Sequence, residues 1–141
     1  MSSWYSLDVA GAAIAPFAGI DVWYDNGNDN QKWSYPSSDG QVGQILAKNS
    51  QMCVTTDGGA GDPLFQYPCQ NAPNQQWKAE LWTAWWNPGK SMVTFLNPWS
   101  GLVMEVYQNS YSPGATVDAW YPNGGLNQSW GLPGCNDPIF C

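Results

Sequence analysis

Short stretches in which apolar and polar residues alternate recur along this chain of 141 residues. Residues 19–24 (GIDVWY) and 91–96 (SMVTFL) show a period of two, which is typical of strands with one buried face. Clusters of Gly, Pro, Asn and Asp separate these stretches and predict turns. No segment carries a convincing amphipathic-helix pattern. The pattern therefore predicts an all-β fold built from short strands.

The motif Asn-Gln-x-Trp occurs three times, at residues 30–33, 74–77 and 127–130. Upstream of each copy, a polar residue follows a hydrophobic one: Asp8, Thr55 and Glu105. Three units of roughly 45 residues predict a threefold assembly, because no unit of this size can bury its own apolar face. We place the units at about 1–40, 41–88 and 89–134, followed by a tail at 135–141, all within a single domain spanning 1–141.

The first and third copies align without a gap, residues 7–33 on residues 104–130, at an offset of 97. The matching pairs are Asp8 and Glu105, Pro16 and Pro113, Asp21 and Asp118, Trp23 and Trp120, Tyr24 and Tyr121, Asn26 and Asn123, and Asn30 and Asn127. The second copy is three residues shorter between its polar residue and its Asn-Gln-x-Trp.

The composition restricts the chemistry. The chain has no His and no Arg, and its formal net charge is −7; its basic residues are Lys32, Lys48, Lys78 and Lys90. Nucleic acid and anionic membranes are disfavoured as partners, since both are bound by clustered basic residues. No apolar run is long enough to span a bilayer, so no membrane insertion is expected. An enzyme here would have to work with carboxylates alone.

The three Asn-Gln-x-Trp motifs, the upstream acid beside hydrophobic residues and the internal cysteine pair resemble the ricin B-type lectins, also seen as family 13 carbohydrate-binding modules. The resemblance covers nearly the whole chain. It implies a β-trefoil with pseudo-threefold symmetry, a barrel capped by hairpins with four strands per repeat. It also implies non-catalytic binding of galactose, GalNAc or xylan-type sugars. No cofactor is expected, and no metal, because the Asp and Asn residues show no calcium-loop spacing.

A neutral sugar needs an aromatic face for its C–H patch and carboxylate or amide groups for its hydroxyls. By the resemblance, the acid binds two hydroxyls, the aromatic stacks on the ring, and the Asn adds a hydrogen bond. Gln31 and Gln128 would orient the acid from behind. Asp21 and Asp118, two residues before the aromatic, share its strand face and would contact the sugar or support the residues that do. The candidate sites are Asp8, Asp21, Trp23, Asn30 and Gln31 in repeat one, and Glu105, Asp118, Trp120, Asn127 and Gln128 in repeat three.

Simpler interpretations stand beside these. Trp33, Trp77 and Trp130 are expected in the core, where the repeated motif closes the hydrophobic layer. Asp8 could be a turn residue, and Trp23 and Trp120 half-buried strand aromatics. The extra methylene of Glu105 predicts weaker binding or a different sugar in repeat three. Repeat two has Thr55 in place of the acid and Tyr67 at the aromatic position, so its site is expected to be empty or weak.

Residues 80–90 (ELWTAWWNPGK) join repeats two and three and predict a hairpin. Trp82, Trp85 and Trp86 either form an exposed patch through which the chain self-associates, or fold back over the barrel. A trefoil that inhibits a protease or binds another protein is one rival function. A binding module cut from a glycoside hydrolase is another. Hydrolysis by a carboxylate pair is disfavoured, because the pairs repeat with the fold symmetry whereas catalysis needs one asymmetric site.

Four cysteines allow three pairings. We favour the local ones, Cys53 with Cys69 and Cys135 with Cys141, which close short loops and indicate an oxidising compartment. The first residues, MSSWYSLDV, do not resemble a signal peptide. The protein is therefore expected to be secreted after removal of a signal that precedes this numbering, or else cytosolic with reduced thiols. Repeat one lacks a full first strand, and we expect Pro138–Phe140 of the tail to help fill that position.

Overall fold

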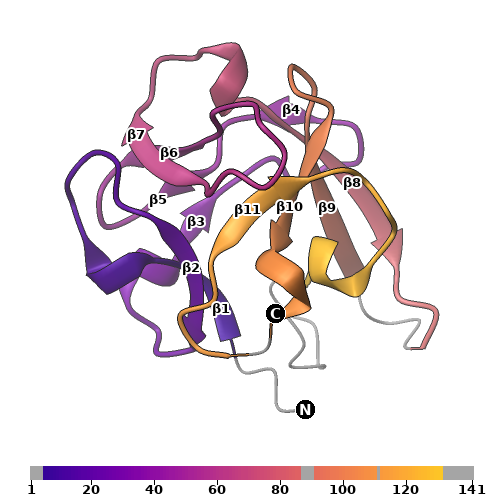
Figure 1. Ribbon diagram of the computed structural model, residues 1–141, viewed down its shortest axis with the longest axis horizontal. Coiled ribbons are helices and arrows are strands. Elements are labelled where there is room, and N and C mark those ends of the chain that lie inside the picture. Colours follow the sequence, from indigo (N-terminus) through magenta and orange to yellow (C-terminus); the bar gives the residue numbers. More distant parts are fainter. Residues whose placement is uncertain (1–4, 87–90, 111, 132–141) are drawn as a thin grey trace.

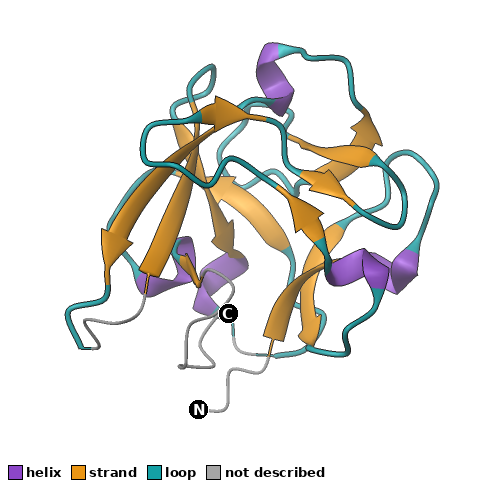
Figure 2. Cartoon of the chain, turned by 180° about the vertical axis from the view of Figure 1, so that it is seen from behind, coloured by secondary structure: helices purple, strands orange, loops and turns teal. Residues whose placement is uncertain are grey.

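The computed structural model describes residues 5–86, 91–110 and 112–131 (Figure 1). Its strands are β1 Tyr5–Val9, β2 Ile20–Tyr24, β3 Trp33–Ser34, β4 Val42–Gly43, β5 Leu46–Ala47, β6 Met52–Thr55, β7 Phe65–Pro68, β8 Trp77–Thr83, β9 Ser91–Asn97, β10 Leu102–Val106, β11 Val117–Trp120 and β12 Trp130–Gly131. The helical segments are single 3-10 turns, η1 Ala10–Ala12, η2 Asp29–Gln31, η3 Pro73–Gln75, η4 Tyr107–Asn109 and η5 Leu126–Gln128. They lie at the outer ends of the strands (Figure 2). No helix in these ranges is long and apolar enough to cross a membrane. The all-β prediction is confirmed.

Each repeat is organised around one antiparallel hairpin: β1–β2, β6–β7 and β10–β11. The first strand of each hairpin carries the polar residue found upstream of the motif, and the second strand carries the aromatic. Asp8 lies directly opposite Asp21, and Glu105 lies directly opposite Asp118. The two gaplessly aligned repeats therefore have the same strand register.

The loop of each hairpin binds the next repeat. An N–H group in the loop donates to the carbonyl oxygen that immediately precedes the next repeat's aromatic. The three bonds run from Phe17 to Gln66 (2.8 Å), from Gly61 to Ala119 (2.7 Å) and from Gly114 to Val22 (2.7 Å). Because the third loop returns to the first repeat, the contacts close a ring. The aromatic strand of each repeat is therefore bonded to the hairpin loop of a neighbouring repeat.

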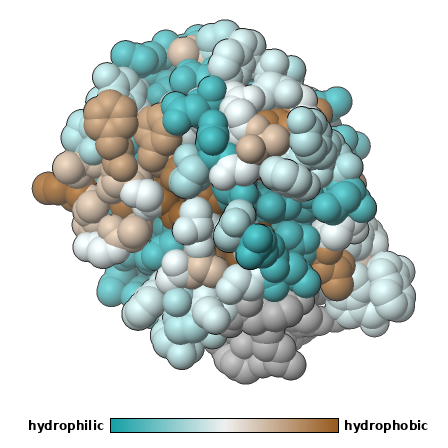
Figure 3. Space-filling view, in the orientation of Figure 1, coloured by the Kyte–Doolittle hydropathy of each residue, from teal (hydrophilic) through white to brown (hydrophobic). Residues whose placement is uncertain are grey.

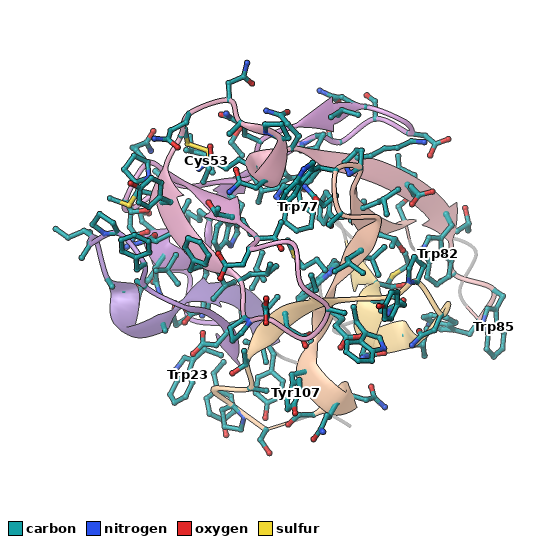
Figure 4. The ribbon with its side chains drawn as sticks, turned by 45° about the horizontal axis from the view of Figure 1, so that its top comes forward. Trp23, Cys53, Trp77, Trp82, Trp85 and Tyr107 are labelled. Atoms are coloured by element: carbon teal, nitrogen blue, oxygen red, sulfur yellow. A yellow bond between two sulfur atoms is a disulfide. The ribbon has the colours of Figure 1, made fainter. Side chains whose placement is uncertain are left out.

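The tryptophans of the Asn-Gln-x-Trp motifs belong to the scaffold. Trp77 and Trp130 are buried in the core, and Trp33 is half-buried and packs against it. The indole N–H of Trp77 donates to the carbonyl of Val54 (3.1 Å), and that of Trp33 donates to the carbonyl of Leu7 (2.9 Å). Trp77 lies deep in the molecule (Figure 4). The core position predicted for these side chains is confirmed, with Trp33 the least enclosed.

Cys53 and Cys69 form the predicted disulfide, which ties β6 to the residue that follows β7. The predictions for Cys135, Cys141 and Pro138–Phe140 fall outside the described residues. They remain predictions.

The segment between repeats two and three is a hairpin, as predicted, with β8 and β9 paired from Lys78–Leu96 to Thr83–Ser91. Of its three tryptophans, Trp85 is 82% exposed, while Trp82 and Trp86 are half-buried. Trp82 and Trp85 lie at the opposite side of the molecule from Trp23 (Figure 4). The tryptophans therefore do not all fold back over the barrel, and self-association through them stays a prediction.

Candidate functional site

The acid of repeat one is held in place by two amide side chains of the motif. Asn30 donates from Nδ2 to Oδ1 of Asp8 (2.6 Å) and to the carbonyl of Val9 (3.2 Å). Gln31 donates from Nε2 to the same Oδ1 (3.2 Å) and to the carbonyl of Tyr24 (2.8 Å). Asp8 is buried, so its orientation is fixed by these bonds.

The same network recurs in repeat three. Gln128 donates from Nε2 to Oε1 of Glu105 (3.1 Å) and to the carbonyl of Tyr121 (2.9 Å). Asn127 donates to the carbonyl of Val106 (3.0 Å), but its bond to Oε1 of Glu105 is long, at 3.4 Å. The longer Glu105 side chain is thus held less tightly by its Asn than Asp8 is.

A second carboxyl group stands beside each of these acids. Burial, together with the neighbouring Asp8 carboxylate, raises the pKa of Asp21 to about 8. Burial, together with Glu105, raises the pKa of Asp118 to about 7. Asp21 and Asp118 therefore keep their protons to a higher pH than an ordinary aspartic acid does, which lowers the charge of each pair near neutral pH.

A pocket lies over each acid pair. The pocket of repeat one, here called site one, has a volume of about 350 Å³ and is lined by Asp8, Gly11, Ala12, Asp21, Trp23, Asn26, Asn28 and Asn30. The pocket of repeat three, site three, has a volume of about 570 Å³ and is lined by Ala60, Gly61, Asp62, Glu105, Tyr107, Gln108, Asn109, Asp118, Trp120, Asn123 and Asn127. Gln31 and Gln128 line neither pocket and act on the acids from behind.

The indoles of Trp23 and Trp120 form the aromatic walls of the two pockets. They are 42% and 40% exposed, so a large part of each ring is open to a ligand. A loop glycine from the preceding repeat in the ring lies against each indole. A Cβ on Gly114 would lie 3.6 Å from Cζ3 of Trp23, and a Cβ on Gly61 would lie 3.3 Å from Cζ3 of Trp120. Glycine at these positions leaves the indoles clear of a loop side chain.

Repeat two differs from the other repeats at the acid position and at the loop position that holds glycine in them. Thr55 takes the acid position and accepts a hydrogen bond from Nε2 of Gln75 (3.1 Å), so the amide network survives without a carboxylate. Phe17 stands where the other repeats have glycine, with φ at +70°, and its ring centroid lies 5.0 Å from that of Tyr67. Figure 3 shows apolar surface on the side of the molecule where the β1–β2 loop lies. The aromatic of repeat two is thus covered by a side chain of its neighbour.

Within the described ranges, no group of three His, Cys, Asp or Glu side chains could hold a metal ion. The chemistry that the two pockets offer is therefore that of carboxyl groups, amides and an indole face.

Comparison with known proteins agrees with this arrangement. The family model described as the ricin-type beta-trefoil lectin domain matches residues 3–130. The chain belongs to the ricin-type β-trefoil lectin family. A search of the curated proteins found no match.

Solved structures place this lectin domain in the β-trefoil fold. The designed threefold-symmetric protein ThreeFoil is 26% identical, with a TM-score of 0.75 over 91% of this chain and 89% of that one. The C-half of the earthworm R-type lectin, solved in complex with GalNAc, is 22% identical, with a TM-score of 0.64 over 89% of each chain. The agglutinin from Abrus precatorius is 24% identical, with a TM-score of 0.65 over 92% of this chain and 45% of that one. The predicted trefoil is confirmed.

The sequence did not reveal the loop residues of one repeat that lie against the aromatic or the pocket of the next repeat. Phe17 contacts Tyr67, Gly114 lies against Trp23, and Gly61 and Asp62 of repeat two line site three. The gapless alignment already matched Phe17 with Gly114, which was the available signal. The same alignment sets Tyr107, Gln108 and Asn109 of site three against Ala10, Gly11 and Ala12 of repeat one.

Proposed function

We propose that this lectin domain, taken as one unit over residues 1–141, binds glycans without catalysis at sites one and three. The supporting observation is that one constellation occurs twice: an oriented acid, a neighbouring carboxyl group, an Asn and a half-exposed indole, in the same register around a pocket. Galactose, GalNAc and xylan-type sugars are the candidate ligands.

Each part of the constellation has a role with a sugar. The Asp8 carboxylate accepts hydrogen bonds from two hydroxyls, which are stronger than bonds between neutral groups. The face of Trp23 covers the C–H patch of the ring. Asn30 uses its nitrogen on Asp8 and Val9, so its oxygen is the atom that we assign to a ligand hydroxyl. Asp21 lines the same pocket, and its hydrogen bond with Asp8 is one cause of its raised pKa, so we assign its proton to the bond between the two carboxyl groups.

Site three has the same parts with Glu105, Asp118, Trp120 and Asn127. Its pocket is larger, and a further carboxyl group, that of Asp62, is among the residues that line it. We therefore assign it a different sugar preference from site one. Repeat two is assigned no sugar, since it lacks the carboxylate and Phe17 covers Tyr67.

Binding at one open surface pocket should be weak, with a dissociation constant around 1 mM. Useful affinity then comes from two sites that engage one multivalent glycan. The two sites also allow agglutination without dimerisation. Secretion is part of the proposal, because the Cys53–Cys69 disulfide fits an oxidising compartment.

A second candidate is the same binding activity inside a larger enzyme. The exo-beta-1,3-galactanase 1,3Gal43A from Clostridium thermocellum is 22% identical, with a TM-score of 0.68 over 92% of this chain but only 29% of that one. This likeness concerns the fold alone. It supports a comparison between the isolated domain and any longer form of the chain.

A glycan array tests the proposal. Wild-type protein should bind a limited set of glycans, and the free sugar should compete. Trp23→Ala combined with Trp120→Ala should abolish the signal, whereas Trp99→Ala should not, because Trp99 is 57% exposed but lines neither pocket. Binding that free sugar does not compete for and that survives the double substitution would favour a protein partner. Release of reducing ends would favour a hydrolase.

A further inference from the structure

A third pocket lies outside the threefold pattern of sites. It has a volume of about 440 Å³ and is lined by Glu80, Trp82, Trp85, Thr94, Val103, Pro122, Gly124, Gly125, Leu126, Gln128 and Ser129. We call it the hairpin pocket, because β8 and β9 form one side of it. The other side is the segment 122–129 of repeat three. This same segment lines site three through Asn123 and Asn127, so the two pockets share a wall.

Trp82 and Trp85 form the aromatic side of the hairpin pocket, and both pack against the indole of Trp86. Trp86 lies edge-on to both neighbours, 5.9 Å and 72° from Trp82 and 5.3 Å and 85° from Trp85. Trp85 is the most exposed of the large hydrophobic side chains in the described residues, and it lines the pocket. An exposed indole that already packs against a neighbouring ring can stack on a ligand at low entropic cost, because little side-chain freedom remains to be lost on binding.

The polar side of the pocket stands next to this surface. Glu80 lies directly opposite Thr94 in the β8–β9 register, and both line the pocket. Alternation along β8 puts Glu80 and Trp82 on the same strand face, away from the buried Trp77 and Ala79. A carboxylate and a hydroxyl thus stand beside two indoles, with no Lys among the lining residues.

We propose that the hairpin pocket is an additional carbohydrate site, which takes one neutral sugar residue. The C–H face of the sugar stacks on Trp85 and Trp82, and its hydroxyls donate to the carboxylate of Glu80 and bond to Thr94. The choice of a sugar as the ligand rests on the proposed function of the domain. The site itself does not, because it lies between repeats and uses none of the acids or aromatics of sites one and three.

The test is a titration of ¹⁵N-labelled protein, followed at the indole N–H signals. The probes are galactose, GalNAc and xylotriose, each at concentrations up to about 100 mM, well above the expected dissociation constant. Trp82→Phe and Trp85→Phe assign the two signals. In the Trp23→Ala/Trp120→Ala background, the Trp82 and Trp85 signals should still shift and saturate with at least one probe. Glu80→Gln should raise the dissociation constant obtained from these shifts about tenfold, which corresponds to the loss of one charge-assisted hydrogen bond. Trp99→Ala should leave this dissociation constant unchanged.

Two outcomes would overturn the inference. One is that neither signal responds to any probe. The other is that both signals shift with protein concentration in the absence of sugar, alongside a dimer in sedimentation equilibrium, which would assign the indoles to a second copy of the chain. The readouts separate the two proposals: response of Trp23 and Trp120 alone supports only sites one and three, and response of Trp82 and Trp85 alone supports only the hairpin pocket.

Discussion

The ring of Phe17 lies against that of Tyr67, with centroids 5.0 Å apart, at the position where the other two repeats place Gly61 and Gly114. Phe17 holds a φ of +70°, which costs a bulky residue about 1–2 kcal/mol. The contact crosses from repeat one to repeat two. One side chain thus covers the aromatic of a neighbouring repeat, and the three repeats of the trefoil are not equivalent at this position.

Opening the site of repeat two should therefore need two changes. Phe17→Gly relieves the strained φ and uncovers Tyr67, and Thr55→Asp supplies a carboxylate within reach of Gln75. We expect the double variant to gain sugar-dependent shifts of the Tyr67 backbone amide in ¹⁵N NMR spectra.

Each single variant should remain silent at Tyr67, since each leaves one obstacle in place. If the folded double variant also shows no response at Tyr67, the reason proposed for assigning no sugar to repeat two is wrong.

Asn30→Ala should damage site one through its acid. The substitution removes the 2.6 Å bond to Asp8 and the bond to the Val9 carbonyl, all in buried surroundings. We expect a loss of about 1–3 kcal/mol in the free energy of unfolding, measured with urea, and a several-fold weaker response of Trp23 to sugar. Asn127→Ala is the matched control in repeat three and should cost less, because its bond to Glu105 is 3.4 Å. Equal losses from the two variants would argue against this ranking.

Stability should fall as the pH rises from about 4 to about 8. The folded-state pKa values of Asp21 and Asp118, about 8 and about 7, lie above the ordinary value of 3.8. The unfolded chain releases these protons first, so the stability present below pH 4 is lost as the pH rises through the folded-state values. Thermal unfolding over this range measures the slope.

Asp21→Asn and Asp118→Asn should each flatten that slope, because the amide carries no titrating proton. A wild-type melting temperature that rises steadily from pH 4 to pH 8, with no difference in the variants, would contradict the proton assignment.

Removal of the disulfide should affect stability rather than binding. Cys53 and Cys69 are 16 residues apart. Closing a loop of this size lowers the entropy of the unfolded chain, which raises the free energy of unfolding by about 3 kcal/mol. Cys53→Ala/Cys69→Ala should lose about this amount in urea unfolding. The response of Trp23 and Trp120 to sugar should stay within about twofold of the wild type. A large loss of binding in the folded variant would mean that repeat two supports the other sites more directly than its contacts indicate.

Much of the fold was predictable from the sequence because its signals are local and repeated. Asn-Gln-x-Trp marks where each repeat closes, and the gapless alignment matches Asp21 with Asp118, each of which pairs across its hairpin with the aligned acid. The contacts between repeats were not predictable in the same way. That Gly114 faces Trp23, or that Asp62 enters site three, follows from the ring of loop contacts, in which the partners lie far apart in sequence.

The pKa values of Asp21 and Asp118 were also beyond sequence reasoning. Alternation places each acid on the face of its aromatic, but burial depends on the loop that the neighbouring repeat lays against the strand. The bridges of Asp21 with Thr116 and of Asp118 with Pro63 supply this cover.

The central claim is that two separate sites, each built on its own acid, bind sugar. The most direct measurement follows the indole signals of Trp23 and Trp120 during a sugar titration of the wild type, Asp8→Asn and Glu105→Gln, which keep the side-chain shape and remove the charge. We predict that both signals respond in the wild type, only Trp120 in Asp8→Asn and only Trp23 in Glu105→Gln. Unchanged responses in both variants, or no response in the wild type to any glycan that the protein binds, would contradict the account.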